Sequence, residues 1–358
     1  MDKMIIVLTK QLIAIHSTAD QKESLHEALN VAMQSLRGHR YVRYEKDGIP
    51  SIVFYNTPTF PKKFTVILNA HLDVVPAVND LFTPRIHGNR LYGRGAYDMK
   101  AAAATEICLF NNLAKTISFP LGLQLVTDEE IGGFCGAQYQ KKQGVDATCM
   151  IVGETSSNFS IGAYSKGIIW MTITFTGKSA HAAYLWKGKN ACSELNTFLN
   201  KLWCAFPIPE KELWKTTVNV ARISTPNTTN NKVPDSACVQ LDIRYIPDDK
   251  DQIVQTIRSL LPKSAKVDIT ENEPARSIHK DDPFVLRFKN IAQHILNRDV
   301  SVVGKAHGTD LRHYPQTVGL EFGPTGNGPH EDNEWVDILS LSQFYDILRA
   351  FLLSLSTK

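Results

Sequence analysis

Four apolar runs in this chain each lead into a carboxylate or an imidazole, and this repeated arrangement limits the folds open to it. FTVILNA precedes His71, GLQLVTD precedes the pair Glu129-Glu130, CMIVG precedes Glu154, and GLEFGP comes shortly before His330. Short apolar and β-branched runs of this kind predict buried strands. In open sheets of parallel strands, ligands bind at the carboxyl ends of the strands. The arrangement therefore predicts a sheet with acidic and histidine side chains gathered along one edge.

Helices separate these strands in the first part of the chain. The stretch AAAATEICLFNNLA (101–114) is rich in strong helix formers, and it follows the loop GRGAYDMK, which contains Asp98. Strands that alternate with helices predict an α/β fold with a mainly parallel sheet.

The pattern changes in the middle of the chain. Two long alternating strands at 167–177 and 238–246 enclose a helical stretch near 190–205. Long alternation predicts a sheet with one solvent-facing side, and hence an inserted α+β domain. We therefore expect a discontinuous catalytic domain, residues 1–164 and 275–358, and an inserted domain, residues 165–274.

The composition of the 358-residue chain excludes several classes of protein. An apolar content of 43% and a charged content of 21% are typical of a soluble globular protein, and the length predicts more than one core. A net charge of +3 with scattered Lys and Arg argues against nucleic acid or a membrane surface as a partner. Six cysteines without CxxC spacing favour reduced thiols. Lys10 and Gln11 interrupt the apolar N-terminal segment, which argues against a membrane span there. We expect a soluble, cytoplasmic protein.

Six separated residues predict metal-assisted hydrolysis: His71, Asp98, Glu129, Glu130, Glu154 and His330. Two imidazoles and three carboxylates supply ligands for a pair of divalent metals, and one carboxylate is left to act as a base. Oxygen and imidazole ligands suit Zn²⁺, Co²⁺ or Mn²⁺, with zinc as the default. Glu129 and Glu130 point in different directions in extended backbone, so one can bind metal while the other moves protons. Asp73, on the same face of the strand as His71, can orient its imidazole.

Five motifs occur in one order along nearly the whole chain: HLD at 71–73, GRGAYDMK, TDEEIGG, GETS and PHEDNE. Together they resemble the M20 metallopeptidase family, which includes succinyl-diaminopimelate desuccinylase, acetylornithine deacetylase, aminoacylase-1 and glutamate carboxypeptidase. The resemblance implies a zinc-hydrolase catalytic domain and an inserted lid, which in this family is often also the dimerisation surface.

The resemblance also implies a role for each site residue. Two sets of three ligands would share one aspartate: His71, Glu130 and Asp98 around one metal, and Glu154, His330 and Asp98 around the other. Glu129 matches the general acid and base of the family. Asp73 matches the residue that orients the first histidine.

The inserted domain is implied to complete the site. His181 in TGKSAHAAYLWKGKNA matches a histidine that stabilises the oxyanion and that, in many dimeric members, reaches the active site of the other subunit. Asn231 and Arg244 in NKVPDSACVQLDIR match residues that hold the substrate, and an arginine fork suits a carboxylate. Gly308 and Thr309 in HGTDLRHY match a segment that contacts substrate from the catalytic domain, although its usual serine is missing.

Two further features depart from the family pattern. The lid motif usually carries a proline shortly after its histidine, whereas Tyr184-Leu185-Trp186 occupies that stretch here, so dimer geometry or specificity can differ. Some histidines match no ligand position and are expected to be ordinary loop or helix residues: His87, His279, His307 and His313.

These observations predict a dinuclear-metal amidohydrolase that cleaves the amide bond of an N-acyl-L-amino acid, because GRGAYDMK and GETS look most like the desuccinylase and deacetylase branch. A dipeptidase or carboxypeptidase is the main alternative, since the same residues serve both reactions. A metal-binding homologue without catalysis is a remote alternative, because Glu129 and all ligand positions are filled. A metal-dependent phosphoesterase lacks support, because no Gly-rich phosphate cradle or basic cluster accompanies the acidic loops of this chain. The expected partners are a small N-acyl amino acid or short peptide and, through the inserted domain, a second copy of the chain.

Overall fold

The computed structural model describes residues 2–211, 213–278, 281–306 and 308–356. The chain divides into two compact units. The first comprises Met1–Ala163, Ile278–Val303 and Thr309–Lys358, and the second comprises Tyr164–Ser277 and Gly304–Gly308.

Residues 304–308 are placed differently from the expectation, which put them in the catalytic domain. They belong to the second unit. The main-chain N–H of Lys166 donates to the carbonyl oxygen of Lys305 (3.2 Å), which ties this segment to the start of that unit. Gly304 lies so close to the Trp214 ring that a Cβ atom there would come within 2.3 Å of it. A glycine at position 304 therefore lets the chain pack against Trp214 within the second unit.

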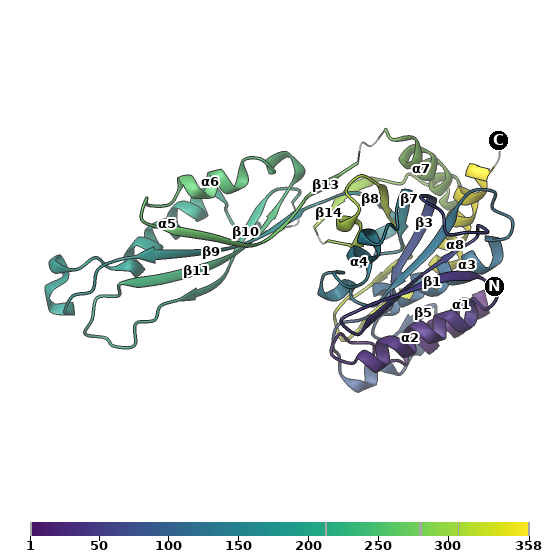
Figure 1. The fold of residues 1–358 in the computed structure, drawn as a ribbon, viewed down its shortest axis with the longest axis horizontal. Coiled ribbons are helices and arrows are strands. Elements are labelled where there is room, and N and C mark those ends of the chain that lie inside the picture. Colours follow the sequence, from purple (N-terminus) through teal and green to yellow (C-terminus); the bar gives the residue numbers. More distant parts are fainter. Residues whose placement is uncertain (1, 212, 279–280, 307, 357–358) are drawn as a thin grey trace. The chain divides into compact units, whose positions relative to one another are not determined.

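The first unit is built on a mixed sheet whose central strands are parallel (Figure 1). The strand order is β1 (Arg40–Lys46), β2 (Ile49–Tyr55), β6 (Leu121–Val126), β3 (Phe64–His71), β7 (Ala147–Val152), β15 (Val318–Glu321) and β8 (Ile161–Ser165), with β13 (Arg276–Ser277) and β14 (Val302–Lys305) paired to β8. β3 pairs in parallel with β6 and β7, and β7 pairs in parallel with β15. The mainly parallel sheet predicted from the sequence is confirmed.

Helices and loops cover both faces of this sheet. Successive strand residues alternate between two apolar clusters: Ile52, Leu68 and Ile151 lie in the larger one, and Val53, Ile67 and Met150 in the smaller one. The larger cluster includes residues of α1 (Asp2–Ile13), α2 (Lys22–Ser35), α3 (Ala101–Leu113), α7 (Pro283–Leu296) and α8 (Ile338–Ser356). The smaller cluster includes Ala137 of α4 (Ala137–Lys142) and Tyr314. Because the central strands are buried on both faces, their sequences are continuous apolar runs.

Among the described residues, α8 is the one helix whose length and composition would allow it to span a membrane, with a mean hydropathy of 1.3. Its apolar side chains instead pack in the larger cluster, where Phe344, Leu348 and Phe351 are fully buried. We therefore assign α8 as a core helix.

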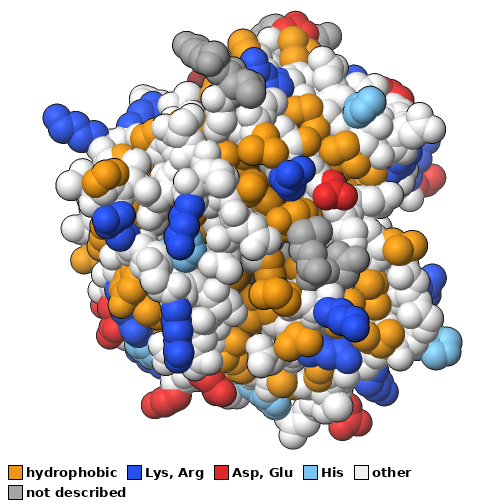
Figure 2. All heavy atoms as spheres, turned by 90° about the vertical axis from the view of Figure 1, so that its right-hand side faces the viewer, with side chains coloured by type: hydrophobic (Ala, Val, Ile, Leu, Met, Phe, Trp, Pro, Cys, Tyr) orange, Lys and Arg blue, Asp and Glu red, His pale blue; other side chains and the backbone are white. Residues whose placement is uncertain are grey.

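Figure 2 shows one face of the molecule, on which exposed hydrophobic side chains are interspersed with charged ones, a mixture that is ordinary on protein surfaces.

A small antiparallel sheet also belongs to the first unit. Its order is β16 (Gly326–Asn327), β17 (Trp335–Asp337), β5 (Arg90–Tyr92) and β4 (Arg85–His87). The pairing of β5 with β17 joins two segments that are far apart in the sequence.

The second unit has its own sheet and core. Its strands are ordered β10 (Thr217–Ser224), β11 (Ser236–Tyr245), β9 (Gly167–Thr176) and β12 (Lys266–Glu273), and neighbouring strands pair antiparallel. Apolar residues of this sheet form a cluster with residues of α5 (Ala191–Ala205) and α6 (Ile253–Ser259). Burial alternates along β11 and β12, as expected for a sheet with one face on a core. Asn190 caps α5 by accepting the N–H of Cys192 (2.9 Å).

Candidate functional site

Three neighbouring parallel strands bring together side chains that are distant in the sequence. His71 ends β3 and lies opposite Val126, the last residue of β6. The chain leaves β6 into a short 3₁₀ turn, Glu129–Ile131, and it leaves β7 through Gly153 to Glu154. Because β3 lies between β6 and β7, these carboxylates gather around His71 at the carboxyl ends of the strands.

The small antiparallel sheet contributes Asp98 and His330. β5 and β17 pair with Tyr92 opposite Trp335. The chain that leaves β5 toward Asp98 therefore runs beside the chain that enters β17 from His330. Asp98 lies in the turn Ala96–Lys100, where its own backbone is not helical (φ −118°, ψ 93°).

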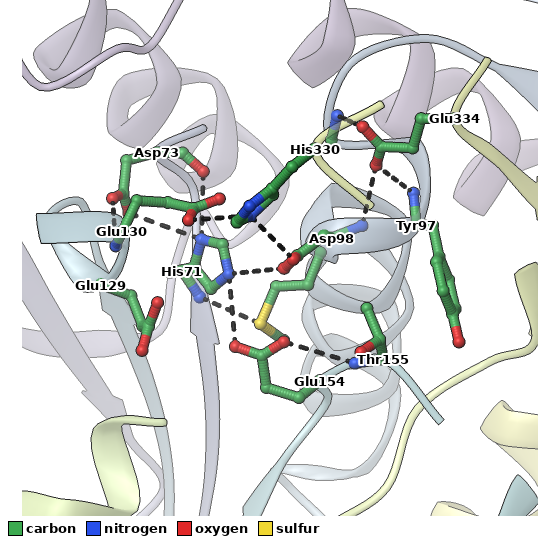
Figure 3. A network of polar contacts seen from close by, with 12 residues as sticks. His71, Asp73, Tyr97, Asp98, Glu129, Glu130, Glu154, Thr155, His330 and Glu334 are labelled. Atoms are coloured by element: carbon green, nitrogen blue, oxygen red, sulfur yellow. Dashed lines mark hydrogen bonds and ion pairs between the residues drawn. The ribbon is translucent and has the colours of Figure 1, made fainter. Parts of the chain in front are cut away.

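The ligand atoms form two groups that share Asp98 (Figure 3). In the first group, Nε2 of His71 lies 3.1 Å from Oδ1 of Asp98 and 3.4 Å from Oε1 of Glu154. In the second, Nε2 of His330 lies 3.4 Å from Oδ2 of Asp98 and 3.1 Å from Oε2 of Glu130. Each oxygen of Asp98 thus faces a different group, so Asp98 would serve as a ligand in both groups.

The grouping of the ligands that the resemblance implied is wrong. Glu154, which was expected beside His330, lies beside His71, because β7 is the direct neighbour of β3. Glu130, which was expected with His71, reaches His330 instead. Its main-chain N–H donates to Oδ2 of Asp73 (3.0 Å), which holds the turn after β6 in this position.

Asp73 contacts His71 mainly through the main chain. Nδ1 of His71 lies 3.0 Å from the carbonyl oxygen of Asp73 and 3.5 Å from its Oδ1. Because a carbonyl oxygen only accepts, Nδ1 carries the proton and Nε2 is the atom left to bind a metal. The carboxylate of Asp73 has the separate task, described above, of holding the Glu130 segment.

The electrostatics of both groups favour added positive charge. Burial alone would lower the pKa of His71, but contacts with Asp73, Asp98 and Glu154 raise this pKa well above its usual range. Contacts with Asp98 and Glu130 raise the pKa of His330 to about 10. Although burial opposes it, the two imidazoles hold the pKa of Asp98 well below its usual range. The carboxylates around the two imidazoles therefore favour positive charge at this site.

Glu129 lies outside both ligand groups (Figure 3). Its side chain is 11% exposed, and its Oε1 lies 3.3 Å from Nη2 of Arg312. Burial raises the pKa of Glu129 well above its usual range, and the nearby Glu154 carboxylate adds to this, while His71 and Arg312 oppose it. A carboxylate that is beside the ligands but does not belong to either group can exchange protons.

His181 belongs to the second unit and is exposed. Its Nδ1 accepts the main-chain N–H of Ala183 (3.1 Å). The neutral imidazole therefore carries its proton on Nε2, which is free to donate. Tyr184, Leu185 and Trp186 are exposed beside it.

Arg244 and Asn231 are also in the second unit. Arg244 lies on β11, where Nε and Nη2 donate to the two carboxylate oxygens of Asp242 (2.8 and 3.0 Å). A substrate carboxylate would have to compete with Asp242 for this guanidinium. Asn231 is exposed, and its carbonyl oxygen accepts the N–H of Ala182 (2.9 Å), which links it to the segment of His181.

The two residues expected to contact substrate from the catalytic domain divide between the units. Gly308 belongs to the second unit, which corrects its expected placement, and Thr309 belongs to the first. Thr309 is buried, and its Oγ1 accepts the N–H of Leu311 (3.3 Å), so its hydroxyl caps the following 3₁₀ turn. His279 and His307 lie outside the described residues.

Two charged residues beside the site had no predicted role. Arg312 lies in HGTDLRHY and faces Glu129, and Glu334 lies in PHEDNE and binds the turn that carries Asp98. Both lie within motifs that the sequence analysis had identified. Their position inside these motifs was the one signal in the sequence that could have pointed to them.

His313 forms a hydrogen bond to the main chain directly after the Glu129–Ile131 turn. Its Nε2 donates to the carbonyl oxygen of Gly132 (2.9 Å), and burial, with Arg312 and Lys142 nearby, lowers its pKa to about 4. An unfolded histidine titrates near pH ~6.5. Between these two values the unfolded chain binds a proton that the folded chain does not, so this group lowers the free energy of unfolding as pH falls.

His313→Gln is therefore expected to reduce the acid sensitivity of the fold, because glutamine can still donate to Gly132 but does not titrate. Thermal unfolding of the wild type and the variant at pH ~7 and ~5 tests this. The loss in melting temperature between these pH values should be smaller in the variant. His87→Gln, at an exposed histidine on β4, is the matched control. Equal losses in the wild type and His313→Gln would contradict the prediction.

Comparisons with known proteins agree with this fold and these motifs. Residues 67–354 match the description "Peptidase family M20/M25/M40". Succinyl-diaminopimelate desuccinylase of Pelagibacter ubique is 27% identical over 312 residues, which cover 79% of this chain and 80% of that protein. A protein of Aspergillus niger named as a probable carboxypeptidase is 26% identical over 307 residues, covering 78% of this chain and 70% of its own length.

Solved structures show the same fold at lower sequence identity. Aminopeptidase PepT from Bacillus cereus superposes with a TM-score of 0.82 at 18% identity, covering 100% of this chain and 99% of its own. The YXEP protein of Bacillus subtilis, described as a dinuclear metal binding peptidase from the M20 family, has a TM-score of 0.74 at 14% identity, covering 99% and 98%. Because the family match covers most of the chain, this protein is a hydrolytic enzyme acting on amides or peptides, and it belongs to peptidase family M20/M25/M40.

Proposed function

We propose that this chain is a dinuclear-metal amidohydrolase that cleaves the amide bond of an N-acyl-L-amino acid. The observation that carries the proposal is the sharing of Asp98 between two three-residue ligand groups, with the carboxylate of Glu129 outside both. Each group offers one imidazole and two carboxylates. This donor set suits Zn²⁺, and Co²⁺ or Mn²⁺ would also be accommodated.

The residues fit two cations because the cluster attracts positive charge and has an oxygen atom without a hydrogen-bond partner. Asp98, Glu130 and Glu154 raise the pKa of the imidazoles that they contact, so the cluster attracts positive charge. Oε1 of Glu130 is buried without a hydrogen-bond partner, and an oxygen of this kind can serve as a ligand. His71 presents Nε2 because Nδ1 is held by the main chain.

When bound, two divalent ions polarise the scissile carbonyl and lower the pKa of a water molecule. The carboxylate of Glu129 takes a proton from the attacking water and passes it to the nitrogen of the leaving amine. Arg312 orients this carboxylate by its contact with Oε1. The Nε2 proton of His181 would stabilise the developing oxyanion.

The second unit is proposed to act as a lid and as the surface through which two copies associate. Arg244 would exchange its contact with Asp242 for the carboxylate of the amino-acid part of the substrate. Asn231 and the main chain of Gly308 would add polar contacts. Thr309 would act through its main chain, since its hydroxyl already caps a turn.

The main alternative is a dipeptidase or carboxypeptidase with the same site. Carboxypeptidases occur among the similar proteins, and the same residues can cleave an amide beside a carboxylate in either type of substrate. A regulatory homologue without catalysis is a remote alternative, because Glu129 and every ligand position are present.

A substrate panel distinguishes these functions. Purified protein is loaded with Zn²⁺ or Co²⁺ and assayed with N-acetyl and N-succinyl amino acids beside unblocked dipeptides. The N-acyl amino acids are expected to give the highest kcat/KM, and a chelator should remove the activity. Higher kcat/KM for dipeptides would favour the peptidase. Two bound ions without hydrolysis of any substrate would favour the regulatory homologue.

A further inference from the structure

A single buried carboxylate, that of Glu334, holds the turn that carries Asp98 (Figure 3). The side chain is fully buried. Oε2 accepts hydrogen bonds from Nη1 of Arg94 (2.7 Å) and from the N–H of Gly95 (2.9 Å). Oε1 accepts from the main-chain N–H groups of Tyr97 (2.9 Å) and Asp98 (3.0 Å). Both oxygens of one carboxylate thus accept hydrogen bonds from four donor groups of the GRGAYD segment, one guanidinium and three main-chain N–H groups.

The main chain reinforces this connection. The N–H of Gly93 donates to the carbonyl oxygen of Glu334 (3.2 Å), and Nη1 of Arg94 also donates to the carbonyl oxygen of Glu331 (3.1 Å). Gly95 has a φ of +80°, and a Cβ atom there would meet Val74 at 2.7 Å, so glycine lets its N–H point at the carboxylate. The segment that carries His330 and the segment that carries Asp98 are therefore held together at several points.

We propose that Glu334 is a positioning residue that fixes the Asp98 carboxylate relative to His330 and so maintains the second metal site. This inference rests on the proposed two-metal function. His71 and Glu154 follow directly from adjacent strands of the sheet, which hold them in place. His330 lies in a loop, and its side chain is 51% exposed. The group of Asp98, Glu130 and His330 therefore depends on Glu334 more than the group of His71, Asp98 and Glu154 does.

Glu334→Gln tests the role with a side chain of the same size. Glutamine keeps one accepting oxygen, which the Arg94 guanidinium attracts, and its NH₂ then faces the N–H groups of Tyr97 and Asp98. Donor faces donor there, so the Asp98 turn is pushed away from its position. Glu331→Gln is the matched control, because Glu331 lies exposed in the same loop.

The measurements are Zn²⁺ titrations of the metal-free proteins by calorimetry, with metal content after dialysis. The wild type and Glu331→Gln are expected to bind two ions per chain. Glu334→Gln is expected to bind one ion at near wild-type affinity and the second about 10- to 100-fold more weakly, the range typical for groups that orient metal ligands. Excess Zn²⁺ should restore the second ion, because the ligands themselves are still present.

The titrations distinguish a failure of the positioning role of Glu334 from a failure of the proposed two-metal function. Two ions bound by Glu334→Gln at wild-type affinity, or equal weakening of both, would overturn the positioning role while leaving the two-metal function intact. A wild type that binds no ions would instead refute the proposed function. If circular dichroism shows that Glu334→Gln is unfolded, Glu334→Asp, which keeps the charge opposite Arg94 but shortens the reach to Asp98, is judged by the same criteria.

Discussion

Glu129→Gln is expected to lower kcat by about 10²–10⁴-fold, the range for removal of a general acid or base. Glutamine keeps the shape of the side chain and can still contact Arg312, but it cannot accept a proton from water at neutral pH. Since Glu129 is outside both ligand groups, the variant should still bind two ions per chain. KM should change little, because the lost interaction is made with the reacting water.

Steady-state kinetics together with metal analysis measure this effect. Glu331→Gln, an exposed glutamate in the loop of His330, is the control for a change of charge near the site. A Glu129→Gln enzyme with full turnover would remove Glu129 from the proton transfer. A variant that loses an ion would show that Glu129 is a ligand instead.

Asp98→Asn is expected to reduce the metal content from two ions per chain to one or none and to abolish measurable hydrolysis. Each oxygen of Asp98 faces a different ligand group, and the nitrogen of asparagine cannot replace an oxygen as ligand. The loss of affinity should exceed the roughly 10- to 100-fold effect of changing a group that only orients a ligand. It should therefore exceed the effect of Glu334→Gln at the second site.

Calorimetric titration with Zn²⁺ and metal analysis test this prediction, with circular dichroism as the check on folding. Asp332→Asn is the matched control, because Asp332 is exposed two residues from His330. Retention of two ions at wild-type affinity by Asp98→Asn would show that Asp98 does not bridge the two groups.

The central sheet could be predicted from the sequence because its strands are buried on both faces. The runs before His71, Glu129 and Glu154 are continuous in apolar residues, and they form β3, β6 and β7. Parallel strands place their carboxyl ends at one edge, so residues that end these runs meet even though no local contact joins them. His71, Glu130 and Glu154 followed from this rule, whereas Asp98 and His330 come from segments next to the small antiparallel sheet.

The grouping of the ligands could not be predicted in the same way. It depends on which strands are neighbours, and the order β6, β3, β7 is set by long-range pairing. Glu154 meets His71 because β7 lies beside β3, while Glu130 extends toward His330. The same limit applies to Gly304, which lies in the second unit and whose missing Cβ atom allows its close approach to Trp214.

By itself, the sequence predicted the parallel α/β core, the set of candidate ligands and one spare carboxylate in the pair Glu129-Glu130, because apolar periodicity and donor chemistry are local properties; the resemblance to the M20 family assigned the spare carboxylate to Glu129. Only the tertiary structure decided how the ligands divide, that Asp73 holds His71 by its main-chain carbonyl, and that Glu334 secures Asp98. The last contact joins residues 236 positions apart, and it exists because β5 and β17 pair antiparallel. Strand pairing, which brings distant segments within hydrogen-bonding distance, is the physical reason for this division.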